Sequence, residues 1–328
     1  MPAALKDIAF ALMGWVCTPL ALGATWAVVR LWTRVRTARP RWRVVGRIAA
    51  VLLGLLATVL LAAGVYGLWV RYRPQPSALV RPLHPGIEYQ RFSRRAPRPI
   101  VVHVTRVDLG TPGLEFVLTP VETGGCLSAK TTSSFLSDHD VDLAINTQFF
   151  YTCPDEPRAE GFAVGQRQRP VGVYAVGGTS VVRQPWLGNT IYIAADGSIS
   201  LYDPPEVIHH AFTGRHRLVE DGRALQPDDS FVAPRLAVGF DQARTTMTFA
   251  LVDGRQRGYS EGLRLSEMAT LLVELGVHDA IELDGGGSAT MVTRGDDGGP
   301  TVLNAPIHTR IPGRERPVAN HLGIRVAR

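Results

Sequence analysis

Two long stretches without a charged residue constrain this chain more than any other feature. Residues 8–29 and 48–70 contain no Asp, Glu, Lys or Arg. Each run has about the 20 residues that a helix needs to cross the hydrocarbon core of a bilayer. We therefore predict two transmembrane helices, at about 8–29 and 48–70, which make residues 1–73 a membrane anchor.

The charges between the two runs predict the orientation of this anchor. Residues 30–47 carry seven arginines and no acidic residue, and short loops rich in Lys and Arg stay in the cytoplasm. The expected localisation is thus the cell membrane, crossed twice, with everything after residue 70 extracytoplasmic. The alternative is a cleaved signal peptide followed by one stop-transfer helix, which would leave the C-terminal part in the cytoplasm. The length of the first run and the positive charge after it favour the two-helix hairpin.

The basic character of the chain belongs to the anchor and not to the rest. The net charge is +6, but residues 1–73 alone hold ten basic residues and one acidic residue. The remaining residues hold 25 basic and 28 acidic groups. A nucleic-acid partner is therefore not expected, because such proteins gather positive charge on the binding domain.

After the anchor, the pattern changes first to an aperiodic segment and then to short strands. Residues 74–99 mix proline, arginine and polar residues and are interpreted as a linker. From residue 100 onward, short apolar runs flank turn signals such as Asp196-Gly197, which is typical of hairpins. One helix is predicted over 266–275, with Ser266 as its N-cap and Gly276 as its end. We expect one α+β domain over residues 100–328, with a single mixed sheet and few helices.

The stretch IELDGGGSAT, residues 281–290, is the most suggestive local sequence. Side chains alternate along a strand, so Glu282 and Asp284 share one face. The glycines Gly285 and Gly286 with Gly287 permit positive φ and a close approach of backbone to a ligand, where successive N–H groups can bind an anion. Ser288 adds a hydroxyl. A plain tight turn with solvated acids is the competing interpretation, and the lysine of a Walker phosphate loop is absent.

Polar residues recur at other predicted strand ends. Asn146 follows the apolar run at 143–145, Asp253 and Arg255 follow the strand that ends at Val252, and Arg316 precedes the last strand. Each alone is typical of a turn. Their recurrence favours a shared functional site.

These segments carry a resemblance to a known family. The runs PRLAVGF from Pro234, VDGRQRGYSEGL from Val252, IELDGGGSATMV from Ile281 and RPVANHLGI from Arg316 resemble the phosphodiester glycosidase family, the NAGPA-like or DUF2233 domain. The resemblance covers roughly residues 100–328 and implies a catalytic domain, a hydrolase that removes a sugar from a phosphodiester. It implies functional roles for the following residues: Asn146, Arg235, Asp253, Arg255, Asp284, Gly285, Gly286, Ser288, Asn304 and Arg316.

The sequence departs from the family pattern beside Asn146, where Thr147 and Gln148 replace the usual small residues. A role for Glu282 as the partner of Asp284 is our own inference from strand geometry. The two positions lie about 6.6 Å apart along a strand, which leans toward the inverting arrangement of two glycosidase carboxylates.

The chemistry of such a bond suggests a division of labour. A phosphate leaving group is a weak base, so positive donors matter more than a general acid. We expect Arg235, Arg255 and Arg316 to bind phosphate, and Asp284, with Glu282 and Asp253 as further catalytic candidates, to act at the sugar. Asn146, Asn304 and Ser288 are expected to bind sugar hydroxyls. The expected partners are the membrane and a phosphorylated glycan of the envelope, a glycolipid or an exopolysaccharide.

Other possibilities stay open at this point. No cofactor is expected, although a divalent cation on Asp284 or Asp253 would suit oxygen ligands. Cys126 and Cys153 form an even pair outside the membrane and are candidates for a disulfide, with two unpaired thiols as the alternative. Two other functions compete with the glycosidase: a non-catalytic protein that binds phosphorylated glycan, and a phosphodiesterase that attacks phosphorus.

Overall fold

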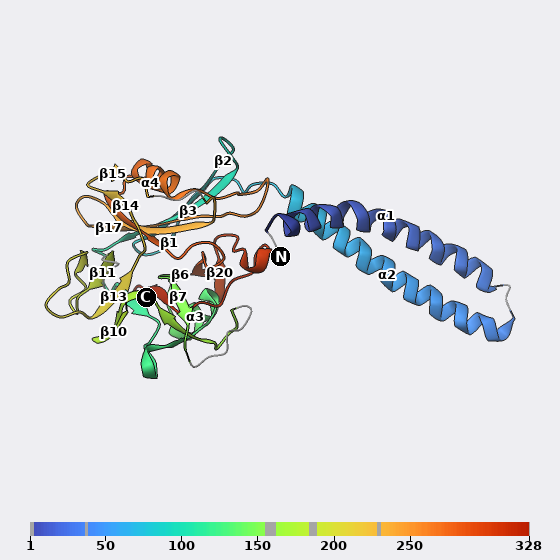
Figure 1. Ribbon diagram of the computed structural model, residues 1–328, viewed down its shortest axis with the longest axis horizontal. Helices are drawn as coiled ribbons and strands as arrows, with labels where there is room; N and C mark the ends of the chain where they lie inside the picture. Colours follow the sequence, from blue (N-terminus) through green and yellow to red (C-terminus); the bar gives the residue numbers. More distant parts are fainter. Residues whose placement is uncertain (1–2, 37–38, 155–161, 184–188, 228–230, 328) are drawn as a thin grey trace. The chain divides into compact units, whose positions relative to one another are not determined.

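The computed structural model describes residues 3–36, 39–154, 162–183, 189–227 and 231–327. The chain divides into two compact units. The first comprises Met1–Pro74 with Gln256–Tyr259, and the second comprises Gln75–Arg255 with Ser260–Arg328. Figure 1 shows long helices in the first unit and mainly strands in the second.

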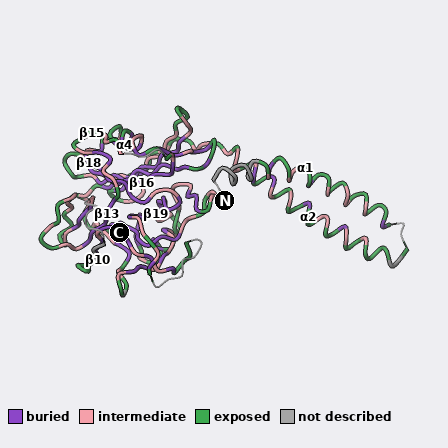
Figure 2. The backbone as a smooth tube through the Cα atoms, in the orientation of Figure 1, coloured by how far each residue is buried: buried purple, intermediate pink, exposed green. Residues whose placement is uncertain are grey.

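The first unit contains two long antiparallel helices, α1 (Ala3–Arg36) and α2 (Pro40–Tyr72). Both are long and apolar enough to cross a membrane, over Leu12–Arg36 and Trp42–Tyr72. They approach closely at glycines: a Cβ added at Gly64 would lie 2.5 Å from Thr18 Oγ1. Apolar side chains along both helices are mostly exposed, as Figure 2 shows in green and pink. An exposed apolar surface of this length suits a lipid environment better than water.

The second unit confirms the α+β class, although its strands form four sheets and not one mixed sheet. The largest sheet has eight strands in the order β1 (Leu79–His84), β2 (Ile87–Arg94), β3 (Ile100–Asp108), β17 (Thr246–Val252), β16 (Arg235–Phe240), β18 (Asp279–Leu283), β14 (Arg217–Glu220) and β15 (Arg223–Ala224). Neighbouring strands in this sheet all pair antiparallel.

Three smaller sheets complete this unit. One has the order β20 (Pro300–Val302), β19 (Met291–Arg294), β6 (Leu143–Asn146), β21 (His321–Arg325) and β4 (Glu115–Leu118). Another has the order β10 (Thr179–Arg183), β9 (Gly172–Val176), β13 (His210–Thr213), β11 (Thr190–Ile193) and β12 (Ile199–Leu201). The third joins β5 (Leu127–Ser128), β8 (Arg167–Pro170) and β7 (Phe150–Thr152). Short 3₁₀ turns occur at η1 (Thr123–Gly125) and η3 (His308–Arg310).

The predicted linker over 74–99 is wrong for most of its length, because β1 and β2 form there. Ile87 and Tyr89 alternate with polar residues and are buried, and β2 pairs with β3 along its whole length. Pro82 lies in β1, an edge strand, where a missing N–H costs little. This hairpin contains many arginines and prolines, so its short alternation of apolar and polar residues is hard to recognise in the sequence.

Two hydrophobic clusters lie on opposite faces of the eight-stranded sheet. One face packs on the smaller sheets and includes Ile281 and Leu283. The other face, which includes Ala237 and Ala280, is covered by α4 (Leu265–Glu274). A further helix, α3 (Thr132–His139), packs on the sheet of β6 through Phe135 and Leu136.

Helix α4 begins one residue earlier than the sequence predicts. Its N-cap is Arg264 and not Ser266, since the Glu267 carboxylate reaches back and accepts the Arg264 backbone N–H at 2.8 Å. Its end at Gly276 is as expected: this glycine has a φ of 82°, a left-handed conformation that favours glycine. The helix thereby covers the sheet face toward which Glu282 points.

Candidate active site

Strand β18 lies between β16 and β14. It carries Glu282, and Asp284 follows directly after its last residue. Because Ile281 and Leu283 point into the core between the sheets, Glu282 must point to the opposite face, the face covered by α4. Glu282 stands opposite Ala237 of β16. Arg235, two residues before Ala237, lies on that same face and is the diagonal neighbour of Glu282.

A cavity of about 460 Å³ opens at the end of β18. It gathers seven of the residues that the sequence singles out: Arg235, Arg255, Glu282, Asp284, Gly285, Gly286 and Arg316. Its size falls within the range of small-molecule sites, about 300–1,000 Å³. Residues from four distant parts of the chain therefore meet at one strand end.

Glu282 is buried, and only one of its two carboxylate oxygens accepts a hydrogen bond within the described residues. Its Oε1 accepts a hydrogen bond from Arg235 Nη1 at 3.1 Å, whereas its buried Oε2 has no hydrogen-bond partner among the described residues. His216 Nε2 lies 3.9 Å from that oxygen. Burial raises the pKa of Glu282 to about 7 against the attraction of Arg235 and Arg215, and Asp284 adds to the rise. This carboxyl can hold a proton near neutral pH.

Asp284 follows β18 directly and is held by its backbone. Its N–H donates to the Thr147 carbonyl at 2.7 Å, and its carbonyl accepts from Asn146 Nδ2 at 2.6 Å. Burial raises the pKa of Asp284 to about 6, opposed by a hydrogen bond from Ser288 and by the charges of Arg316 and Arg255. A fixed backbone aims this carboxyl into the cavity.

Arg255 and Arg316 lie over the glycine turn. Arg316 Nη1 donates to Ser288 Oγ at 3.2 Å and its Nε donates to His308 Nδ1 at 3.3 Å. Burial lowers the pKa of His308 to about 4, so this ring is neutral at neutral pH and can accept. Burial and the repulsion of Arg310 and Arg316 lower the pKa of Arg255. Two crowded guanidinium groups thus face the acids, an arrangement that an anionic ligand would relieve.

The glycines allow close packing against Pro234 and Arg316, and they do not form a fully open row of N–H groups for an anion. A Cβ at Gly285 would lie 2.7 Å from the Pro234 carbonyl oxygen, and a Cβ at Gly287 would lie 2.5 Å from Arg316 Nη2. Gly286 has a φ of 61°, and its N–H donates to the Pro234 carbonyl. The Ser288 N–H donates to the Gly285 carbonyl. The expectation of a row of open N–H groups is therefore wrong at Gly286 and Ser288, whose N–H groups are already bonded.

Arg235 lines the cavity, but its guanidinium is engaged by the protein. It donates to Glu282 Oε1, to the Leu263 carbonyl at 3.0 Å and to the Phe231 carbonyl at 2.6 Å. Such a side chain positions and neutralises Glu282. Its guanidinium is thus occupied by Glu282 and two backbone carbonyls, and the phosphate-binding role suggested by the sequence stays a prediction.

Four predicted site residues do not line the cavity: Ser288, described above, and Asn146, Asp253 and Asn304. Asp253 is buried and accepts from Ala305 N at 2.9 Å and from Asn304 Nδ2 at 3.1 Å, and its Oδ2 lies 3.1 Å from His103 Nε2. The Asn304 side chain also bonds to the backbone, because its Oδ1 accepts a hydrogen bond from Met291 N. Asn146 accepts from Thr290 N at 3.0 Å and supports Asp284 from behind. These hydrogen bonds hold the strand ends in place, and the sugar-binding role of Asn146 and Asn304 stays a prediction.

Cys126 and Cys153 are joined as a disulfide, with Cα atoms 6.4 Å apart. The bridge connects the segment before β5 to the end of β7. It lies outside the cavity lining.

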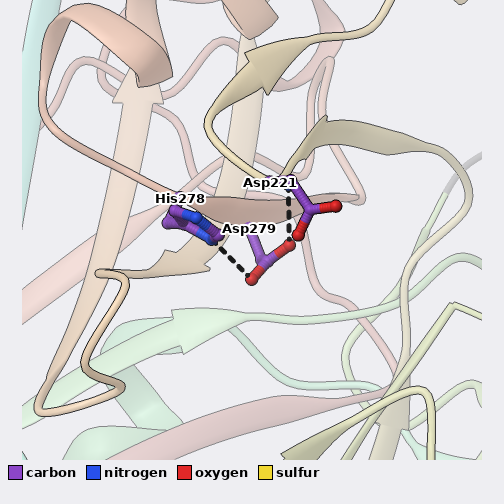
Figure 3. A group of neighbouring side chains, drawn as sticks. All are labelled: Asp221, His278 and Asp279. Atoms are coloured by element: carbon purple, nitrogen blue, oxygen red, sulfur yellow. Dashed lines mark hydrogen bonds and ion pairs between the residues drawn. The ribbon is translucent and has the colours of Figure 1, made fainter.

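Only one group of three or more side chains suitable for a metal occurs in the described part of the chain, and it is remote from the acid pair. Asp221, His278 and Asp279 lie together where β18 begins (Figure 3), whereas Asp284 follows its end, about 16 Å away along the strand. His278 Nδ1 lies 3.1 Å from Asp279 Oδ2, and Arg244 Nη2 donates to the same oxygen at 3.4 Å. A guanidinium at that oxygen competes with a cation. The group is an ion-pair cluster.

Two basic residues that line the cavity, Arg215 and His216, were not predicted from the sequence. They lie on the turn between β13 and β14, which carries no recognisable motif. Their place depends on β14 pairing with β18, where Arg217 stands opposite Ile281. A cationic pair directly before a short strand is the only signal in the sequence.

The fold and the family comparison define the class of protein, a hydrolase of the glycosidase type. The family model described as phosphodiester glycosidase matches residues 139–325, more than half of the chain. The chain belongs to this family. No curated protein sequence matches the chain significantly.

Solved structures share the fold at low sequence identity. The catalytic domain of zebrafish N-acetylglucosamine-1-phosphodiester alpha-N-acetylglucosaminidase, auto-inhibited by its pro-peptide, has a TM-score of 0.55 and 21% identity over 79% of this chain and 93% of that one. A hypothetical protein from Synechocystis has a TM-score of 0.54 and 15% identity over 77% of this chain and 64% of that one. An exported protein from Burkholderia pseudomallei has a TM-score of 0.50 and 15% identity, over 70% and 75%. The chain thus spans less than two thirds of the Synechocystis protein.

Proposed function

We propose that this chain hydrolyses the bond between the anomeric carbon of a sugar and a phosphodiester, in an envelope glycopolymer, a glycolipid or an exopolysaccharide. The observation that carries the proposal is that a buried acid pair and two guanidinium groups open on one cavity. The arginines suit a phosphate and the carboxylates suit chemistry at the sugar carbon. Family membership supports the same reaction.

The two acids take different parts because their pKa values differ. Asp284, with a pKa of about 6, is mostly ionised at neutral pH and serves as the base that activates water or as the nucleophile. Glu282, with a pKa of about 7, is partly protonated at neutral pH, and its Oε2, which has no hydrogen-bond partner among the described residues, is available to the sugar or to water. The bond from the anomeric carbon to the phosphate oxygen breaks, and the phosphate monoester leaves.

Arg255 and Arg316 stabilise this leaving group. The departing phosphate gains negative charge as the bond breaks, and the two guanidinium groups are fixed in place beforehand by the glycine turn. Fixed donors aimed at developing charge are worth more than mobile ones. A weakly basic phosphate therefore leaves without a general acid.

We also propose that α1 and α2 anchor the enzyme in the cell membrane, with the hydrolase outside the cytoplasm. The two apolar spans and the seven arginines of residues 30–47, around the connection between the helices, support this orientation. Single cysteines placed at Ser77 and at Thr33, in a Cys17→Ser background, test it with an impermeant maleimide in intact cells. Labelling at position 77 and protection at 33 is expected, and the reverse pattern contradicts the orientation.

The experiment that tests the activity is hydrolysis of a panel of sugar 1-phosphodiesters by the full chain in detergent. Wild type is compared with Asp284→Asn and with Asp296→Asn, a matched change at an exposed acid. We expect sugar release by the wild type and by Asp296→Asn, and a loss of at least about 100-fold in Asp284→Asn. Thermal melting controls for folding.

Two outcomes would favour other functions. Glycan binding without release from any diester, undiminished in Asp284→Asn, indicates a binding protein. Label from H₂¹⁸O that appears in the phosphate, and not in the sugar, indicates attack on phosphorus.

A further inference from the structure

The turn that carries Arg215 is tied to the backbone of Glu282. The Arg215 N–H donates to the Glu282 carbonyl at 3.0 Å, and the Glu282 N–H donates to the His216 carbonyl at 2.8 Å. Gly214 has no room for a Cβ against the same carbonyl. The backbone of Arg215 and His216 is therefore fixed beside the acid pair.

The Arg215 guanidinium lines the cavity without an acidic partner among the described residues. Its carbon lies 5.6 Å from the centroid of the Phe149 ring, which also lines the cavity. Glu282, the acid nearest to it in the strand order, is already paired with Arg235. Arg215 thus brings to the cavity a positive charge that attracts Glu282 from a distance but makes no direct ion pair with a carboxylate of the described residues.

This charge lies apart from the pair that we assign to phosphate. In the sheet order β17, β16, β18, β14, Arg255 follows β17 and Arg215 precedes β14, so the two arginines flank β18 from opposite sides. The cavity has two cationic ends with the acids between them.

A neutral sugar linked to a phosphodiester would match only one of these ends. The single negative charge of the diester faces Arg255 and Arg316 when the anomeric carbon meets Asp284. The other side of the sugar then faces Arg215 and His216. We propose that the sugar itself carries an anionic group, a carboxylate or a phosphate, which Arg215 binds. This inference rests on the proposed function and names its substrate class.

Binding and turnover together test the inference. Calorimetry with the full chain in detergent compares glucose 1-phosphate, glucuronic acid 1-phosphate and glucose 1,6-bisphosphate, and kcat/KM is measured with the corresponding methyl 1-phosphodiesters. The wild type should prefer one anionic sugar by roughly 10-fold or more, the size of one charge-assisted hydrogen bond. The uronate and the 6-phosphate arms distinguish the two sources of charge.

Variants of Arg215 assign the preference to this side chain. In Arg215→Gln the ratio between the anionic and the neutral sugar should fall to within about threefold, and Arg215→Lys should keep part of it. Arg223→Gln, at an exposed arginine of the same sheet, is the matched control and should keep the wild-type ratio. The ratio is the readout because loss of Arg215 also changes Glu282, which affects all sugars alike.

The two proposals fail in different ways. Equal affinity and turnover for neutral and anionic sugars in the wild type overturn the anionic subsite and leave the hydrolase standing. A binding preference that Arg215→Gln abolishes, with no diester hydrolysed, supports the subsite and overturns the hydrolase. A preference that survives Arg215→Gln overturns the assignment to Arg215.

Discussion

The Arg316 guanidinium lies against Gly287 so closely that a Cβ at this glycine would stand 2.5 Å from Arg316 Nη2. The third glycine of the DGGGS run therefore leaves the space that the Arg316 guanidinium occupies. Its φ is not in the left-handed region, so the need for glycine at 287 is one of space.

Gly287→Ala should displace Arg316 with little effect on folding. We expect KM for a sugar 1-phosphodiester to rise about 10-fold or more, since one charge-assisted contact to the phosphate is weakened. Steady-state kinetics with thermal melting measures this. Gly110→Ala, at an exposed turn, is the control; an unchanged KM in Gly287→Ala would remove Arg316 from phosphate binding.

Asp284→Asn should stabilise the protein while it removes activity. The folded pKa of Asp284, about 6, lies above its ordinary value of 3.8, so ionisation costs folding free energy. Stability is thus lost as the pH rises from about 4 through 6, and the cost is fully present at pH 8. We expect the variant to gain roughly 2 kcal/mol at pH 8 and little at pH 4. Chemical denaturation at both pH values tests this, and a variant less stable than wild type at pH 8 contradicts it.

The pH dependence of kcat/KM should report the acid pair as a unit. Activity should rise as Asp284 ionises near pH 6 and fall near pH 7, as Glu282 loses the proton with which it can donate a hydrogen bond to the sugar. The Arg215 charge lowers the pKa of Glu282, so Arg215→Gln should move the upper limb to higher pH. Arg223→Gln should leave both limbs in place. If the upper limb does not move in Arg215→Gln, the ionisation of Glu282 is not the cause of that limb.

Asn304→Ala should act on stability and not on substrate affinity. The side chain makes hydrogen bonds to Asp253, to the Ala289 carbonyl and to Met291 N, and the loss of buried partners costs about 1–3 kcal/mol. Melting temperature should fall while KM changes less than about twofold. A raised KM with unchanged melting would restore the sugar-binding role suggested by the sequence.

Features that depend on neighbouring residues along the chain could be predicted from the sequence. The charge-free runs determined two long apolar helices, and period-two alternation placed Ile281 and Leu283 in the core with Glu282 on the other face. The glycine at position 276 predicted the end of the helix, and its positive φ confirms this. The family motifs marked Asp284, Arg255 and Arg316, which do meet at one cavity.

Which of the marked residues line the cavity could not be predicted in this way, because it depends on contacts between distant strands. Asp253 and Asn304 come from equally marked segments, yet they bond to each other and to backbone, because strand pairing turns them away from the cavity. Arg235 is bound to Glu282, and Arg215 enters the cavity only because β14 pairs with β18. Short-range patterns set the face of each side chain, whereas contacts between distant strands determine what that face meets.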